Sequence, residues 1–331
     1  MSLRVSFLRS VAAAGAVACA PLAASAQGAF IAQCESQSPN AQVQSFCERV
    51  GQAVEITQPR LGISLTGGNP VPGSASTLGM RLGMMPRISI GLRATASYTD
   101  LPPIESIDSD EDLKFPLGSI NADASIGVFN GLSVLPTVGG LGSIDVLGSL
   151  GMIPLPDGEG FSDESPMTWA VGARVGILRE SFTAPGISVS AMYRKLDDIS
   201  YGDSTFNTHD AYFAVNDLSV MSYRAAISKR IPLIGLGAAL GVGYDKYDAR
   251  ALVSVNDPTL LTGSSFTMRT DDLETSRKSA FANLSWTILL LNIVGEAGWQ
   301  EGGDAPAGGT ISAEKLEKAG YFGSIALRLA F

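Results

Sequence analysis

Apolar residues alternate with small or polar residues along most of this chain, and a period of two is typical of a β-strand with two different faces. Residues 87–98 show the alternation most clearly. One face carries Ile88, Ile90, Leu92, Ala94, Ala96 and Tyr98, and the other Arg87, Ser89, Gly91, Arg93, Thr95 and Ser97. Because an arginine at the middle of a bilayer costs about 2–4 kcal/mol, the apolar face is expected to meet lipid and the polar face the inside of a barrel.

The same pattern predicts twelve strands. They cover residues 58–66, 75–84, 87–98, 117–128, 141–150, 167–178, 187–196, 217–229, 234–247, 277–288, 292–300 and 320–331. Short connections alternate with long, hydrophilic ones, as they do in outer-membrane barrels with long loops outside the cell. The expected fold is therefore all-β: a transmembrane antiparallel up-and-down β-barrel of about 12 strands, with a short N-terminal helical segment and both termini in the periplasm.

Two parts of the chain leave alternatives open. Residues 251–255 and 265–269 have strand character inside a predicted loop, and a hairpin there would give 14 strands. Residues 131–156 are rich in glycine and apolar side chains, which fits either a turn plus a strand or a loop folded into the barrel.

Aromatic residues gather near the ends of the predicted strands and share the apolar parity. They are Tyr98, Trp169, Tyr193, Tyr244, Trp299 and Tyr321, with Trp286 near the opposite end. Aromatic side chains concentrate at both membrane–water interfaces, so these residues are expected to form interfacial belts.

The last twelve residues, 320–331, alternate strictly and finish on an aromatic residue. Tyr321, Leu329 and Phe331 lie on the apolar face, and Arg328 lies on the other. In this respect the chain resembles the Gram-negative outer-membrane β-barrel proteins, whose closing strand commonly ends in phenylalanine. The resemblance implies location in the cell outer membrane, contact with outer-membrane lipids, and recognition of Tyr321, Leu329 and Phe331 by the barrel-assembly machinery.

The beginning of the chain has the features of a secretory signal peptide. Arg4 and Arg9 precede an apolar stretch at 11–22, and small residues at 24–26 form a cleavage signature. Cleavage after Ala26 would make residues 1–26 the signal peptide. Cys19 leaves a lipoprotein signal as the alternative.

Residues 27–56 are expected to form a periplasmic segment ahead of the barrel, which would take up residues 57–331. Apolar residues at near-helical spacing predict a helix over 40–56, either a plug in the lumen or a loose extension. Cys34 and Cys47 remain after signal removal in an oxidising compartment, which favours a disulfide. Its loop would contribute about 3 kcal/mol in the chain-entropy model. Free thiols or an intermolecular bond are the alternatives.

Composition excludes several functions. A net charge of −9 argues against nucleic-acid binding, which favours a basic surface. His209 is the one histidine, and its setting has no specific resemblance to an outer-membrane hydrolase or protease. We therefore expect no enzymatic activity, catalytic residue, metal or cofactor.

Charged residues on the inward parity are expected to line the lumen. They are Arg87, Arg93, Asp123, Arg174, Arg194, Arg224, Asp245, Glu296 and Arg328. The leading hypothesis is a passive pore for small solutes of unknown identity. The alternatives are a non-conducting structural or binding barrel that acts through its outer loops, and an importer of hydrophobic molecules similar to the fatty-acid transporters.

Overall fold

The computed structural model describes residues 26–37, 40–80, 85–133, 139–155, 160–161, 165–231, 233–257, 264–303 and 317–331. The predicted signal peptide therefore lies outside the described residues, apart from Ala26. Two helices precede the strands: α1 (Ala26–Gln37) and α2 (Ala41–Thr66). The strands are β1 (Ile88–Leu101), β2 (Leu113–Phe129), β3 (Ser143–Met152), β4 (Met167–Leu178), β5 (Gly186–Leu196), β6 (Ile199–Gly202), β7 (Ala211–Ile231), β8 (Leu236–Asp257), β9 (Ser264–Ile288), β10 (Leu291–Gln300) and β11 (Gly320–Ala330).

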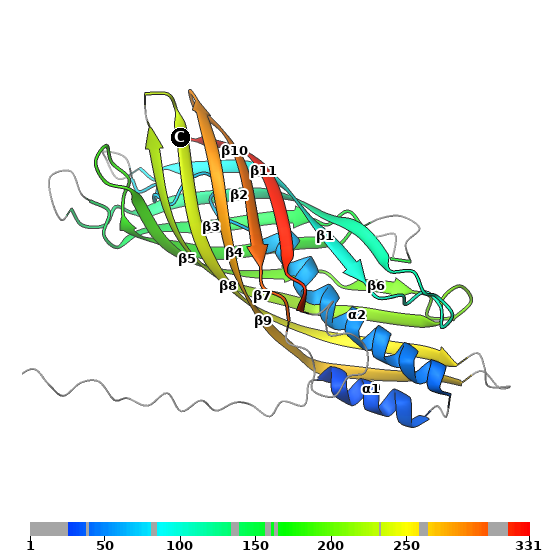
Figure 1. Ribbon diagram of the computed structural model, residues 1–331. Coiled ribbons are helices and arrows are strands. Elements are labelled where there is room, and N and C mark those ends of the chain that lie inside the picture. The colour runs from blue at the N-terminus through cyan, green and yellow to red at the C-terminus, as the bar shows by residue number, and fades with distance from the viewer. Residues whose placement is uncertain are drawn as a thin grey trace, which may run out of the picture.

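Ten of these strands form a closed antiparallel barrel (Figure 1). Neighbours in sequence pair from β1 to β5 and from β7 to β11, β5 pairs with β7, and β1 pairs with β11 to close the ring. The short strand β6 pairs with β7, forms one isolated bridge from Tyr201 to Phe161, and lies outside the ring. The barrel architecture is confirmed, whereas the expected number of 12 or 14 strands in the barrel is wrong.

The difference comes from the first two predicted strands and the possible extra hairpin. Residues 58–66 form the last turns of α2 although Leu61, Ile63 and Leu65 alternate, because they are buried inside the barrel and a helix pairs its backbone groups within itself. The described part of the second predicted strand, residues 75–80, has a single isolated bridge, from Met80 to Pro86. Residues 251–255 and 266–270 do pair with one another, but as the outer ends of β8 and β9.

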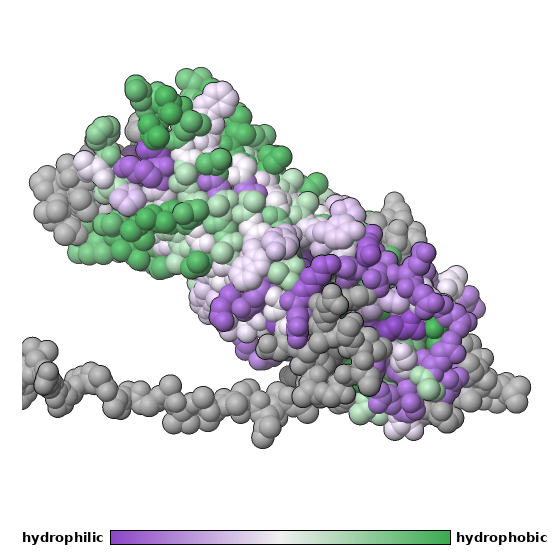
Figure 2. Space-filling view, in the orientation of Figure 1, coloured by the Kyte–Doolittle hydropathy of each residue, from purple (hydrophilic) through white to green (hydrophobic). Residues whose placement is uncertain are grey.

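The apolar parity faces outward in the half of the barrel that has the short turns. Leu92 and Leu240 are each 60% exposed, and Figure 2 shows hydrophobic residues covering this half of the molecule. The seven predicted aromatic residues are all exposed. Trp286 lies near the short turns, and the other six lie near the opposite edge of this half, where Trp299 pairs with Tyr321 and the rings of Trp169 and Tyr193 are 5.8 Å apart. An apolar band with an aromatic edge is the lipid-facing surface of an outer-membrane barrel.

Beyond the aromatic edge the two faces of each long strand exchange character. On the outer face of β8, Leu240, Val242 and Tyr244 are followed by Lys246, Asp248 and Arg250. On its inner face, Asp245 is followed by buried Tyr247, Ala249, Ala251, Val253 and Val255. Strands β7, β8 and β9 have 21, 22 and 25 residues, whereas about 9–11 residues cross a bilayer, so their outer halves form a water-soluble extension with an apolar core.

We expect the cost of a charge on the outer face of β8 to depend on which side of the aromatic edge it lies. Leu240→Arg should lower the free energy of unfolding by about 2–4 kcal/mol, because position 240 faces the hydrocarbon. Asp248→Arg is the matched control above the edge and should change it by less than about 1 kcal/mol. Equilibrium unfolding in lipid vesicles measures both; equal effects would contradict this placement of the membrane.

Candidate functional site: the occupied lumen

The N-terminal segment enters the barrel from the end that has the long connections. There Arg49 donates hydrogen bonds to the carbonyl oxygens of Ile107 (2.9 Å) and Ser109 (2.6 Å) in the β1–β2 connection. The predicted disulfide between Cys34 and Cys47 is present and joins α1 to α2. We call residues 41–80, which continue from this point into the lumen, the plug. No helix in the described ranges is long and apolar enough to cross a membrane.

Helix α2 fills the outer half of the barrel. It packs against β1, β2, β7, β8 and β11, and every residue from Ile56 to Thr66 is buried. Its apolar side chains join the aromatic and aliphatic residues of the strand extensions in one core. Gly62 lies against the ring of Tyr247, where a Cβ atom would overlap the ring. Burial raises the pKa of the Tyr247 hydroxyl, which stays protonated and accepts a hydrogen bond from Gln300 Nε2 at 2.7 Å.

At the end of α2 the interior of the barrel changes from apolar to polar. Gly67 caps the helix, its N–H donating to the carbonyl oxygen of Ile63 at 2.9 Å. Residues 67–79 then continue through the membrane-level half of the barrel without regular secondary structure. An irregular backbone in such a place needs hydrogen-bond partners outside itself, because each buried N–H or C=O that is unpaired is costly.

Three buried arginines supply donors to the carbonyl oxygens of this segment. Arg224 donates to Thr66 O at 2.8 Å and to Gly68 O at 3.2 Å. Arg93 donates to Asn69 O at 3.1 Å, and Arg174 donates to Ser74 O at 3.0 Å.

Each of these arginines also pairs with a carboxylate on the barrel wall. The partner of Arg224 is Asp245 at 2.8 Å, that of Arg93 is Asp123 at 3.3 Å, and that of Arg174 is Asp145 at 2.6 Å. The guanidinium groups therefore bridge the wall and the plug.

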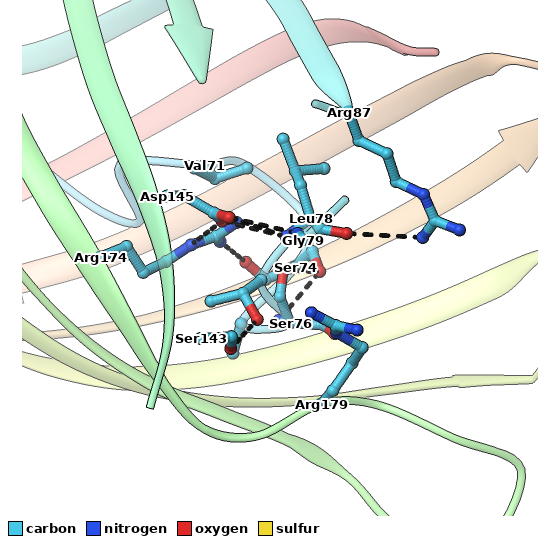
Figure 3. A network of polar contacts seen from close by, with 12 residues as sticks. Val71, Ser74, Ser76, Leu78, Gly79, Arg87, Ser143, Asp145, Arg174 and Arg179 are labelled. Carbon is cyan, nitrogen blue, oxygen red and sulfur yellow. Dashed lines mark hydrogen bonds and ion pairs between the residues drawn. The ribbon is translucent and has the colours of Figure 1, made fainter. Parts of the chain in front are cut away.

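Carboxylates on the wall accept from the N–H groups of the same segment. Glu296 accepts from Asn69 N at 3.0 Å. Asp145 accepts from Leu78 N at 3.0 Å and from Gly79 N at 3.4 Å, and Figure 3 shows its carboxylate between Arg174 and this turn. Gly68 has φ +84° and lies against Glu296, which leaves no room for a side chain there.

The structure places most of the predicted luminal residues inside the barrel. Arg93, Arg174, Arg194, Arg224, Asp245, Glu296 and Arg328 are buried, and the side chain of Asp123 is 12% exposed. Arg194 lies 3.5 Å from Asn121 Oδ1. Arg87 is exposed at the mouth, because β1 begins one residue later. Sequence reasoning missed Asp145, although its place on the inward parity of a predicted strand could have identified it.

Two small cavities lie between the plug and the wall in the part of the barrel described. A cavity of about 10 Å³ lies beside Pro70, Val71 and Arg328, and one of about 20 Å³ beside Pro59 and Arg60. A cavity needs about 10–15 Å³ to hold one water molecule, so neither of these two cavities is large enough to pass a hydrated solute.

Two hydrogen bonds place the two chain ends in the barrel. Gln42, near the start of α2, donates to Asp108 in a long connection at 2.7 Å. The N–H of Phe331 donates to Ile88 O at 2.8 Å at the other end of the barrel (Figure 1). The described N-terminal helices and the C-terminus thus lie at opposite ends of the barrel, and the predicted periplasmic side of both chain ends stays a prediction. Helix α2 also continues across the predicted boundary at residues 56–57.

His209 takes part in the outer aromatic core. Its ring lies 5.6 Å from that of Tyr201, and its Nδ1 atom is 2.9 Å from the Thr208 hydroxyl. These contacts give the histidine a structural role in the extension.

The buried pair of Arg174 and Asp145 gives a test of the contacts that hold the plug. Arg174→Met and Asp145→Leu should each lower the free energy of unfolding by about 3–5 kcal/mol, because each leaves a buried charge without its partner. The double variant should lose less than the sum of the two. Chemical denaturation in vesicles provides the measurement, and Lys246→Met with Glu274→Leu, an exposed pair worth about 1 kcal/mol or less, is the control. Strict additivity at Arg174 and Asp145 would argue against the coupling.

Comparison with known proteins assigns no family to this chain. No family model and no curated protein matches the chain. Among solved structures, the translocator domain of the autotransporter NalP from Neisseria meningitidis is 11% identical with a TM-score of 0.35, covering 84% of this chain and 96% of that one. The outer membrane protease OmpT from Escherichia coli is 11% identical with a TM-score of 0.35, covering 78% and 100%. An outer membrane channel from Pseudomonas putida F1 is 11% identical with a TM-score of 0.34, covering 79% and 99%. At TM-scores of 0.34–0.35 these likenesses assign no activity to this chain.

Proposed function

We propose that this protein is a non-conducting outer-membrane barrel that anchors and presents a folded extension at the cell surface. One observation carries the proposal: residues 41–80 fill the barrel from its long-loop end to its short-turn end. Their contacts with the wall are those of a permanent core. The apolar outer half buries α2, and the polar inner half pairs with the backbone of residues 66–79.

The orientation follows from the lipid-facing surface. The apolar band covers the short-turn half, and outer-membrane barrels carry their long loops outside the cell. In that orientation α1, the start of α2 and the outer parts of β7, β8 and β9 are extracellular, and Phe331 is periplasmic. The disulfide between Cys34 and Cys47 would then stabilise a helical hairpin on the surface.

The presented surface is polar and acidic. The outer face of the extension carries exposed ion pairs, Lys246 with Glu274 and Lys195 with Asp217. The β1–β2 connection carries the acidic residues Asp108, Asp110, Glu111 and Asp112. Such a surface suits binding to other surface molecules or a structural role, whereas passage of solutes would first require the plug to leave the lumen.

Cysteine pairs test whether the plug occupies the lumen in the membrane. The hydroxyl groups of Thr77 and Ser143 are 2.5 Å apart, whereas Ser119 Oγ donates to the backbone oxygen of Ser64, in the last turn of α2, at 2.6 Å. We expect the variant T77C/S143C to form an internal disulfide in nearly all molecules, detected by the changed mobility of the non-reduced protein in gels. Both the wild type and the oxidised variant should give no conductance steps in planar bilayers.

The matched controls exchange the partners. S64C/S143C and T77C/S119C join positions at different heights of the barrel and should remain reduced. Stable conductance steps in the wild type, or equal cross-linking of all three pairs, would overturn the proposal of a closed barrel.

Surface labelling tests the orientation. An epitope tag inserted between residues 38 and 39, in the connection from α1 to α2, should be accessible to antibody on intact cells. A tag between Phe182 and Thr183, in the β4–β5 turn, should be accessible only after the outer membrane is permeabilised. The reverse result would place the helical hairpin in the periplasm.

A further inference from the structure

The short-turn end of this acidic protein is basic. Its described parts are residues 71–80, 85–89, 126–133, 139–146, 174–190, 225–231, 233–240, 284–294 and 326–331. In these ranges the basic residues are Arg87, Arg174, Arg179, Lys229, Arg230 and Arg328, and the acidic residues are Asp145 and Glu180. Six positive and two negative side chains leave an excess of four positive charges, in a chain with a net charge of −9.

Both carboxylates at this end are already engaged. Asp145 pairs with Arg174 and accepts from two N–H groups of the plug. Glu180 accepts from the backbone N–H of Arg230 and lies 3.5 Å from Ser228 Oγ. Neither forms an ion pair with Arg87, Arg179 or Arg328 within the described residues.

Two of the remaining guanidinium groups lie beside the point where the plug leaves the lumen. Arg87 Nη1 donates to Leu78 O at 3.4 Å, and Arg179 Nη2 donates to Asn130 O at 3.1 Å. The Arg179 guanidinium also lies against Gly79, where a Cβ atom would collide with it. Figure 3 shows Arg87 and Arg179 approaching Leu78 and Gly79 from different elements. Each guanidinium keeps donors that are not used by a carboxylate.

A third arginine lies deeper at the same end. Arg328 is only 7% exposed, and its Nε atom has no hydrogen-bond partner among the described residues. The charged groups that act on it include Arg174, Arg230 and Glu180. The carboxylate of Asp123 also lines the small cavity beside Arg328, but its ion-pair partner is Arg93 at 3.3 Å. The cavity beside Arg328 measures about 10 Å³, enough for about one water, so an anion would bind at the mouth outside it.

We infer that the short-turn mouth binds an oxyanion of the phosphate type, held between Arg87 and Arg179 in the field of Arg328. Planar guanidinium groups bind phosphate through paired N–H donors, and a cluster of unneutralised arginines raises the local concentration of anions. The phosphate group comes either from an anionic phospholipid of the adjoining leaflet or from a soluble phosphate. The site does not depend on the proposed surface function.

Thermal unfolding of the full-length protein in a zwitterionic detergent tests the site. The probes are inorganic phosphate against chloride at equal ionic strength, and micelles doped with phosphatidylglycerol against phosphatidylcholine. A ligand of the folded state raises the unfolding midpoint in proportion to the logarithm of its concentration, which gives an apparent affinity. A rise with phosphatidylglycerol alone identifies a lipid headgroup, and a rise with inorganic phosphate identifies a soluble anion.

Variants locate the binding. The double variant R87Q/R179Q should weaken the apparent affinity by about tenfold or more, equivalent to 1.4 kcal/mol or more. The matched variant K246Q/K278Q removes two positive charges from the other end and should keep the wild-type affinity. Heat-modifiable gel mobility shows that each variant is folded, and R328Q gives a second, single change at the same end. Absence of a midpoint rise with either probe, or equal weakening by both double variants, would overturn the site.

Discussion

The structure depends on one requirement: every buried backbone N–H and C=O group must find a partner. The strands satisfy it by closing into a ring, and α2 satisfies it within itself except in its last turn, where Ser119 and Arg224 donate to the carbonyl oxygens of Ser64 and Thr66. The segment after Thr66 satisfies neither condition, and it lies where the wall carries paired arginines and carboxylates. The helix therefore occupies the apolar outer half of the barrel, and the irregular chain occupies the polar inner half. A helix can lie in an apolar interior because its backbone groups are already paired. The irregular segment can lie only where polar side chains of the wall pair with its backbone.

The aromatic edge marks the level at which the surroundings of the long strands change from lipid to water. Below it, lipid surrounds the wall and the lumen is polar; above it, water surrounds the wall and the interior is apolar. Strand β8 shows both arrangements within 22 residues, with Leu240 exposed below the edge and Val253 buried above it. A single plug can therefore pass through both halves, because its composition changes at the level where the wall changes.

The charged side chains in the lumen hold the plug to the barrel wall. In an open channel, Arg93, Arg174 and Arg224 would face water, whereas here they are buried at 3%, 1% and 4% exposure and bridge wall to plug. The charges outside the lumen are divided between the ends, with acidic loops at one mouth and an excess of arginine at the other. This division suits a protein that presents different chemistry on the two sides of a membrane without connecting them.

The sequence by itself determined which face of each strand meets lipid. The alternation of apolar and polar residues predicted all ten barrel strands, the outward aromatic residues and the inward arginines. It could do so because a side chain that faces lipid must be apolar, whereas one that faces the lumen can be polar. The sequence favoured a disulfide between Cys34 and Cys47 over free thiols or an intermolecular bond, and the structure contains it. The contents of the lumen were decided only by the tertiary structure. Residues 58–66 alternate much as a strand does, yet they form a helix because the interior they enter offers no strand to pair with. The contact of Arg224 with Gly68 joins residues 156 positions apart, and local periodicity carries no information about such a pair.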